Sequence, residues 1–186
     1  MSYICHSGGC PGSDMFWENE GNKYGVHTIA YSFGGHKQEG KNRVILSTEE
    51  LNEGFEHVLI ANKKMKRYPQ GQARYIQNLL ARNWFQVKNA ESVFAVGKFL
   101  VSERVMGGTG WAVQMSIDSG KPVFVFDQFS NKWYDFGKGG IFCIYQGIPK
   151  LTENFAGVGT RELNDNGKIA IRKIYEVNLR GGSSIG

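Results

Sequence analysis

Cysteine and proline are scarce in this chain of 186 residues, which contains three Cys and four Pro. The number of cysteines is odd and Cys143 falls within an apolar run, so reduced thiols in a reducing compartment fit better than a disulfide framework. A metal site made from Cys5, His6 and Cys10 is conceivable, but the sequence has no second ligand pair at zinc-like spacing. We therefore expect no metal, and no pattern in the chain predicts a resident cofactor.

Long apolar segments and strongly basic runs are also missing. No stretch approaches 18 apolar residues and no signal-peptide pattern follows Met1, which predicts a cytoplasmic protein (in the host cytoplasm if it is viral) without a membrane partner. The formal charge is only +5, and the basic cluster Lys63–Arg67 is more typical of a solvated loop or helix end than of a nucleic-acid interface. A mildly positive field suits a small anionic ligand.

Glycine, in contrast, is abundant, with 25 residues. The length suits one α/β domain with an ample core, and we expect a single domain over residues 1–180 followed by a flexible tail, 181–186. No internal repeat and no linker divides the chain. Such a glycine content is typical of a loop-rich binding scaffold.

The segment from Ser92 to Gln128 predicts one β-α-β unit. An apolar run, Val93–Val96, ends at Gly97, and a second run, Val123–Phe126, ends at Asp127. Between them, Gly107-Gly108-Thr109-Gly110 precedes residues with helical spacing from Trp111 to Ile117. The two strands look buried on both faces, which predicts a parallel sheet with helices on each side.

The rest of the chain continues the pattern of strands followed by turns and helices. We expect strands at 3–5, 26–31 and 141–145, an exposed loop at 33–43, an aromatic loop or hairpin at 129–136, and helices at about 14–24, 47–62 and 72–87. Ser13 or Asp14 is the expected N-cap of the first helix. A closing helix, at about 166–178, is expected to bury Ile169, Ala170, Ile174 and Val177.

Three glycine-rich turns follow apolar runs and predict an anion site. They are Gly8–Asp14, Gly107–Gly110 and Gly157–Glu162. Without a Cβ, glycine lets backbone N–H groups approach a phosphate at the N-terminus of a helix, although tight turns and close helix–strand packing explain glycines equally well. A pocket ringed by these turns and lined by Trp111, Trp133 and Arg82 would suit a nucleotide.

Four segments resemble the SLOG superfamily, a Rossmann-like group of nucleotide-ligand-binding proteins related to the LOG-type phosphoribohydrolases. They are RNWFQVKNAESVFAVG (Arg82–Gly97), GGTGWAVQ (Gly107–Gln114), KPVFVFDQ (Lys121–Gln128) and FAGVGTRE (Phe155–Glu162), which are similar to its phage and bacterial branch. The resemblance covers nearly the whole chain. It implies a Rossmann-like, doubly wound, mostly parallel sheet with helices on both faces, a pocket over the strand ends, and often a homo-oligomer.

The same resemblance bears on catalysis. The hydrolase branch carries a G-G-x-G-T-x-x-E loop whose final glutamate takes part in cleaving the N-glycosidic bond, and this chain has Trp111 at the threonine position and Gln114 at the glutamate position. An amide cannot act as a general acid or base, although it can hydrogen-bond a ribose or a base. The counterpart of the branch's catalytic arginine is only approximate, at Arg82.

We therefore expect a binding protein that senses or sequesters a nucleotide-derived small molecule, such as an ADP-ribose- or NAD-derived signal, without catalysis. The alternative is a nucleotide N-glycosidase of the LOG type that uses Asp14 or Glu162, and a scaffolding domain with an empty pocket is a third reading. None of the four histidines has a serine or cysteine partner at motif spacing. The expected ligand-binding residues are Gly8, Gly9, Gly12, Ser13, Asp14, Arg82, Asn83, Gln86, Gly97, Gly107, Gly108, Thr109, Gly110, Trp111, Gln114, Asp127, Trp133, Gly159, Thr160 and Arg161.

Overall fold

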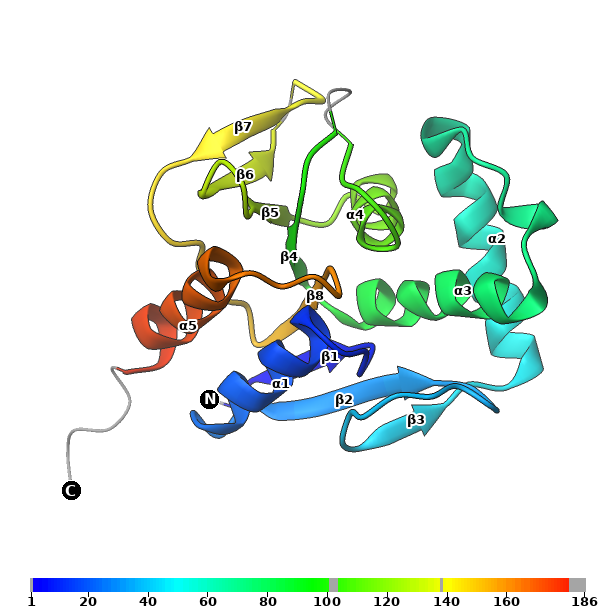
Figure 1. Cartoon of the computed structure of the whole chain (residues 1–186), viewed down its shortest axis with the longest axis horizontal. Helices are drawn as coiled ribbons and strands as arrows, with labels where there is room; N and C mark the ends of the chain where they lie inside the picture. The colour runs from blue at the N-terminus through cyan, green and yellow to red at the C-terminus, as the bar shows by residue number, and fades with distance from the viewer. Residues whose placement is uncertain (1, 101–103, 138, 181–186) are drawn as a thin grey trace.

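The computed structural model describes residues 2–100, 104–137 and 139–180. It contains one eight-stranded sheet with the strand order β3-β2-β1-β8-β4-β5-β6-β7 and helices on both of its faces (Figure 1). This confirms the predicted fold class, an α/β protein with a Rossmann-like, mostly parallel sheet. The predicted tail, 181–186, lies outside the described residues.

The first six strands of that order are parallel, and the last two extend the sheet as an antiparallel hairpin. In spatial order the strands are β3 (Arg43–Ile45), β2 (His27–Ser32), β1 (Ile4–Ser7), β8 (Asn154–Gly159), β4 (Ser92–Gly97), β5 (Val123–Asp127), β6 (Lys132–Phe136) and β7 (Phe142–Tyr145). The carboxyl ends of the six parallel strands lie along one edge of the sheet, and we call this the carboxyl edge.

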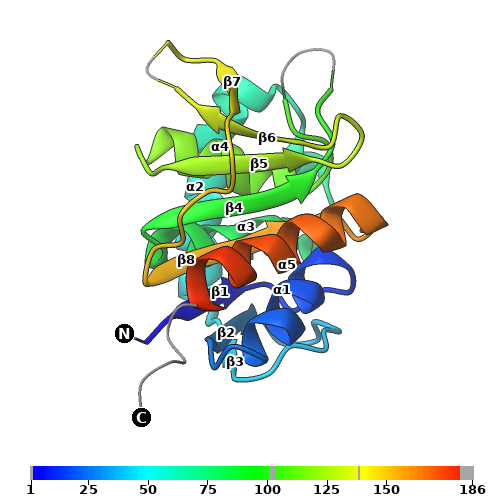
Figure 2. The same ribbon diagram turned by 90° about the vertical axis from the view of Figure 1, so that its left-hand side faces the viewer.

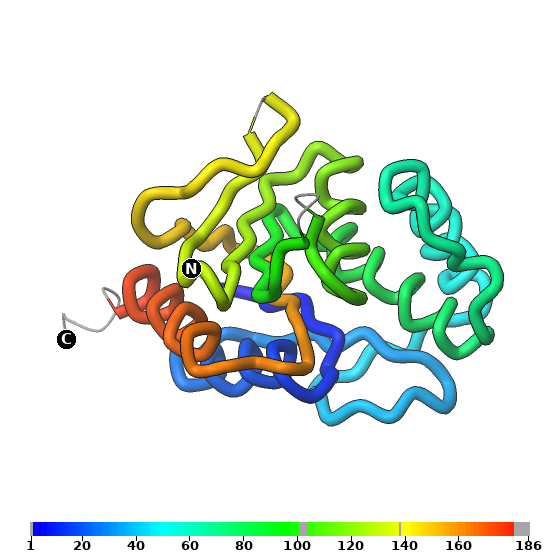
Figure 3. The backbone as a smooth tube through the Cα atoms, turned by 45° about the horizontal axis from the view of Figure 1, so that its top comes forward, coloured from blue at the N-terminus to red at the C-terminus, as the bar shows by residue number. Residues whose placement is uncertain are grey.

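The helices divide between the two faces as the connections require. Figure 2 shows α1 (Ser13–Asn22) and α5 (Asp165–Leu179) in front of the sheet. Behind it lie α2 (Thr48–Met65), α3 (Arg74–Asn89) and α4 (Thr109–Asp118), and the short 3-10 helix η1 (Pro69–Gly71) joins α2 to α3. In the tube view of Figure 3, α5 and α2 lie at opposite ends of the molecule. No helix in the described part of the chain combines the length and the apolarity needed to cross a bilayer.

Helix starts follow the capping chemistry in part. The predicted start of α2 is confirmed, because Ser47 and Glu50 form a reciprocal capping box, with Glu50 N donating to Ser47 Oγ over 3.2 Å. The N-cap of α1 is Gly12, which has no side chain to cap with, so the prediction of Ser13 or Asp14 at this position is wrong by one or two residues. Ser13 Oγ instead donates to Thr160 O.

Two hydrophobic clusters, one on each face, hold the layers together. Trp17 of α1, fully buried, packs at the centre of the cluster under α1 and α5. The prediction for α5 is half wrong: Ala170 and Ile174 are buried, whereas Ile169 is 46% exposed and Val177 is 66% exposed. The buried seam of α5 instead includes Ile171 and Tyr175, each two residues from a misassigned position, and a short apolar pattern does not distinguish the two sets.

The third predicted glycine turn, Gly157–Glu162, is only partly a turn, because its glycines belong to the central strand β8 and only residues 160–162 form the loop that follows. Gly157 and Gly159 lie within β8 rather than after it. A Cβ on Gly157 would lie 2.6 Å from Trp17 Cγ, and one on Gly159 would lie 2.6 Å from Ser13 Cβ. These glycines therefore let α1 pack closely against the sheet, which is the packing explanation rather than the phosphate explanation.

The loop after β2 also differs from the expectation of full exposure. Phe33 and His36 are buried although Lys37 is exposed. The loop folds over the turn after β1, where Glu39 N donates to Gly9 O over 3.0 Å. This cover brings His36 to the carboxyl edge.

Candidate ligand-binding site

The turn after β1 is the most densely polar part of the carboxyl edge. Gly9 and Gly12 have φ values of 63° and 95°, a left-handed region that favours glycine. A Cβ on Gly8 would overlap Arg82 Nη1 and lie 2.6 Å from Asp14 Oδ2. Gly8 is therefore required because two charged side chains from different helices converge on it.

Two adjacent residues of α3 connect the two glycine-rich turns. Arg82 is 5% exposed and donates from Nη1 to Gly8 O in the β1 turn. Asn83 Nδ2 donates to Gly108 O, 3.4 Å away, in the turn before α4. The arginine is thus buried between the turns. It does not extend along the helix surface with its guanidinium in water, as arginines on helices often do.

This face of α3 carries hydrogen-bond donors without acceptors. Among the described residues, Arg82 Nε and Gln86 Nε2 are buried and have no hydrogen-bond partner. Gln86 lies one helical turn from Arg82, so both side chains belong to the same face of α3. Buried donors without partners cost free energy, and a ligand oxygen would satisfy them.

Asp14, in the first turn of α1, is the acid of the cluster. It accepts a hydrogen bond from Cys10 N over 3.4 Å. Burial raises the pKa of its carboxyl from 3.8 to about 6, against the opposing effect of the Arg82 guanidinium. A buried carboxyl that gains a proton near neutral pH can serve either as a hydrogen-bond donor or as a general acid.

The raised pKa of Asp14 gives a stability prediction. Because the folded pKa lies above the unfolded one, the contribution of Asp14 to stability is complete below pH 3.8 and is lost as the pH rises through about 6. We expect Asp14→Asn to raise the free energy of unfolding at pH 7.5 by ~2 kcal/mol and to have little effect at pH 4. Urea denaturation of both proteins at the two pH values measures this, and an equal difference at both would contradict it.

The turn before α4 leaves open space in front of the helix. Gly107 has a φ of 71°, whereas Gly108, the N-cap of α4, has a right-handed φ of −63°. A Cβ on either residue would meet no atom of the described residues within 4 Å, but one on Gly110 would collide with Val105 O. Gly110 therefore serves packing, while Gly107 and Gly108 border unoccupied space. Thr109, the first residue of α4, follows Gly108 and is buried.

A third loop closes the β1 turn from the side of β8. Thr160 N donates to Val96 O over 2.9 Å, and Ser13 N donates to Thr160 O over 3.0 Å. A Cβ on Gly12 would lie 2.6 Å from Arg161 Cα, so the backbone of this loop packs directly on the turn. Glu162, the second acid considered for catalysis, is exposed.

His36 adds a side-chain cluster that the sequence did not reveal. His36 Nδ1 lies 3.1 Å from Ser32 Oγ, and His36 Nε2 lies 3.9 Å from Cys10 Sγ, so this histidine has a serine and a cysteine neighbour in space although no motif spacing indicates them. Burial, together with Arg82 and Arg161, lowers the pKa of His36 to about 4. The imidazole is therefore neutral at pH 7. Motif spacing missed the cluster, but the loops after two adjacent parallel strands share one edge, which is the signal that would have found it.

Other predicted site residues lie elsewhere. Gln114 Nε2 donates to Asp118 Oδ1, one turn along α4, over 2.9 Å. Asp127 accepts hydrogen bonds from Phe129 N and Ser130 N and so closes its own turn. Gly97, at the end of β4, packs beside Val105, since a Cβ there would lie 3.2 Å from Val105 Cγ1.

The two predicted indoles do not face a common pocket. Trp111 belongs to the core cluster under α2, α3 and α4, and Trp133 belongs to the cluster on the opposite face of the sheet. Arg67 lies over the Trp111 ring at 5.9 Å from its centroid. The expectation that both indoles line one pocket with Arg82 is therefore wrong, because Trp111 of α4 and Trp133 of β6 lie in clusters on opposite faces of the sheet.

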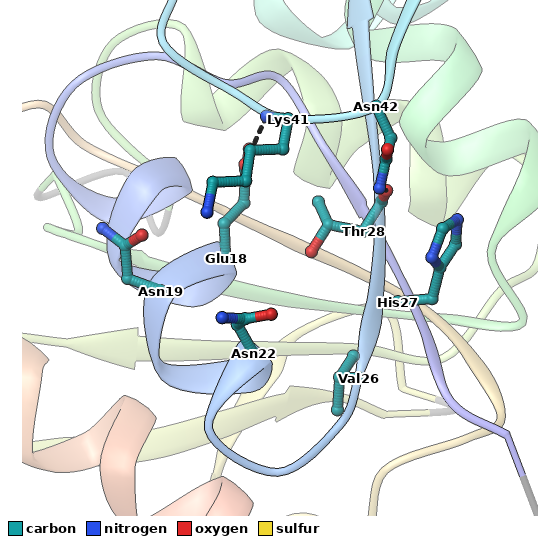
Figure 4. Close-up of a pocket in the computed structure, with 8 residues that line it drawn as sticks. All are labelled: Glu18, Asn19, Asn22, Val26, His27, Thr28, Lys41 and Asn42. Atoms are coloured by element: carbon teal, nitrogen blue, oxygen red, sulfur yellow. Dashed lines mark hydrogen bonds between the residues drawn. The ribbon is translucent and has the colours of Figure 1, made fainter.

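A small cavity lies between α1, β2 and the loop that follows β2 (Figure 4). Its volume is about 80 Å³, and Glu18, Lys41 and Asn42 are among the residues in its wall. Glu18 is held there by Ser7 Oγ, 2.6 Å away, and by Lys41 N, 3.2 Å away. Ligand pockets for small organic molecules usually occupy ~300–1,000 Å³, so this cavity suits ordered water rather than a nucleotide.

The candidate site thus consists of the β1 turn, the start of α1, Arg82, Asn83 and Gln86 of α3, the turn before α4, and the loop that carries Arg161. No group of three or more metal-ligating side chains occurs within the described ranges. Compared with known proteins, the chain matches no protein-family model, no curated protein and no solved structure.

Proposed function

We propose that the carboxyl edge binds a phosphate-bearing nucleotide derivative and releases it unchanged. The observation that carries the proposal is the placement of Arg82 and Asn83, which contact the two glycine-rich turns from adjacent positions of one helix. Ligands of open α/β sheets bind at the carboxyl ends of the strands, where the connections diverge to opposite faces. Here α1 follows β1 on one face and α4 follows β4 on the other, with only β8 between the two strands.

The chemistry of the site favours an anion. Arg82 presents a buried guanidinium with an unpartnered Nε, and Gln86 presents an unpartnered amide on the same helix face. The open space before Gly107 and Gly108 lies at the N-terminus of α4, where the helix dipole attracts negative charge. The SLOG resemblance narrows the ligand class to nucleotide-derived signals such as ADP-ribose or NAD fragments, and under this proposal the protein senses or sequesters one of them.

A ligand panel tests the proposal directly. Purified protein is incubated with AMP, ADP, NAD, ADP-ribose, cyclic ADP-ribose and inorganic phosphate, and the melting temperature and the heat of binding are measured. A true ligand at 100 times its dissociation constant stabilises the fold by ~2.7 kcal/mol. No shift and no heat with any member of the panel would reject the proposal, and a shift with phosphate alone would reject its nucleotide part.

We expect Gly108→Val to abolish ligand binding and to leave the fold intact. The right-handed φ of Gly108 and the open space around it tolerate a side chain, but a branched side chain would occupy the space that a phosphate needs. Circular dichroism checks the fold and calorimetry checks binding. If the folded variant binds the ligand as tightly as the parent, the turn before α4 is not part of the site.

Asp14 favours a second candidate function, a nucleotide N-glycosidase of the LOG type. Its buried carboxyl has a pKa near 6 beside Arg82, which are the properties of a general acid. Gln114, at the position of the branch's glutamate, points instead to Asp118 and supplies no acid. Chromatography of AMP incubated with the protein separates the two functions: intact AMP supports the binding protein, whereas many equivalents of free adenine, abolished by Asp14→Asn, would establish the enzyme.

A further inference from the structure

A second, larger cavity lies far along the sheet from the β1 turn, between the β6–β7 hairpin and α5. Its volume is about 400 Å³, within the range of sites for small organic ligands. Trp133 and Phe126 form part of its wall, with their ring centroids 5.3 Å apart. Trp133, which the sequence suggested as a platform for a base, therefore belongs to this cavity.

Apolar side chains are left uncovered on both sides of this cavity. Ile144 of β7 is 48% exposed and Ile169 of α5 is 46% exposed, and both line it. The helical pattern of α5 predicts a buried residue at position 169, yet the described chain leaves nearly half of Ile169 exposed. An apolar ligand between the two isoleucines would remove this surface from water, which is favourable in proportion to the area covered.

The charge of the cavity has one sign. Lys132 and Lys173 line it, and none of the lining residues in the described part of the chain is acidic. Neither lysine forms an ion pair with a carboxylate of the described residues. Lysine ammonium groups without partners beside an aromatic wall suit a ligand that combines a ring with an anionic group.

We propose that this cavity is a separate binding site for a small aromatic anion. The ring of the ligand lies against the wall that contains Trp133, between Ile144 and Ile169. Its carboxylate, sulfonate or phosphate group lies at the two lysines. The site shares no residue with the carboxyl-edge site, so each is testable without the other.

The test uses anilinonaphthalene sulfonate, an aromatic anion, and phenylnaphthylamine, the same ring system without the charge. Fluorescence titration at low ionic strength is expected to show one saturable site that binds the sulfonate more tightly than the amine. Lys173→Glu is expected to weaken sulfonate binding by about fivefold and amine binding by less than twofold, because an exposed charge pair contributes modestly. Ile169→Ser is expected to weaken binding of both dyes by about tenfold, since it removes apolar contact area without changing the charge.

Matched controls locate the site. Lys64→Glu makes the same charge change at an exposed position of α2, and Arg82→Ala removes the arginine of the carboxyl edge; both are expected to leave the two dye affinities unchanged. Circular dichroism checks each variant, and exposed positions 169 and 173 are expected to tolerate the changes. Non-saturable dye binding, or equal affinities in parent, Lys173→Glu and Ile169→Ser, would overturn the proposal.

Discussion

Replacing Arg82 with alanine is expected to weaken binding of the nucleotide ligand by about 100-fold, since charge-assisted hydrogen bonds contribute ~1.5–3 kcal/mol each. The guanidinium is buried at Gly8, with one nitrogen donating to the turn and Nε lacking a protein acceptor. A planar fork in this position can donate two parallel hydrogen bonds to one phosphate. Isothermal titration calorimetry of parent and variant, with the ligand identified from the panel, measures the loss.

The same helix supplies the control for this prediction. Arg74→Ala removes an exposed arginine of α3 that donates to Asn52 Oδ1, and it is expected to leave the affinity unchanged. Arg82→Lys retains the charge but not the fork, and an intermediate affinity is the expected result. Equal affinities of parent and folded Arg82→Ala would assign Arg82 to structure alone and would remove the main support for the carboxyl-edge site.

Gly157→Ala is expected to lower the free energy of unfolding by about 3 kcal/mol, the upper part of the range for an overfilled core. A Cβ at this position would lie 2.6 Å from Trp17 Cγ and 2.8 Å from Trp17 Cδ2. The indole cannot move aside easily, because its Nε1 donates to Val158 O and its ring packs against Phe155 and Tyr175. For a chain of this length, the melting temperature should fall by about 6–12 °C.

Gly34→Ala is the matched control for the glycine in β8. A Cβ on Gly34 would meet no atom within 4 Å, and its φ is not in the left-handed region. Its effect on stability should stay within about 0.5 kcal/mol of zero. If Gly157→Ala were as stable as Gly34→Ala, close packing of α1 on β8 would not explain why this position of the strand is a glycine.

The predicted and observed structures agree where one periodic signal decides the result. The β-α-β unit from Ser92 to Gln128 follows from apolar runs and helical spacing, and both strands and the helix are confirmed. The capping box at Ser47 is equally local, since its hydrogen bonds join residues three apart. Such features depend on neighbours along the chain and are readable from it.

The errors occur where the partner comes from far along the chain. The glycine pattern predicts a turn at Gly157, and only the presence of Trp17 across the interface explains a glycine in the strand. His36 gained its partners Ser32 and Cys10 because its loop folds back over the β1 turn. Trp111 and Trp133, which the sequence assigns to one nucleotide pocket, lie on opposite faces of the sheet because their neighbours also come from distant parts of the chain. Apolar and glycine patterns define element type better than they define what an element packs against.

The position of β8 in the sheet limits how far this protein can fold while it is being synthesised. β8 pairs with β1 on one side and with β4 on the other, although residues 154–159 are made after both of those strands. Until they emerge, β1 and β4 each present an open edge of unpaired backbone groups, which is the kind of surface that promotes aggregation. A nascent chain that stalls before residue 154 therefore consists of two half-sheets without the strand that joins them, and the native sheet cannot form until residues 154–159 have been made.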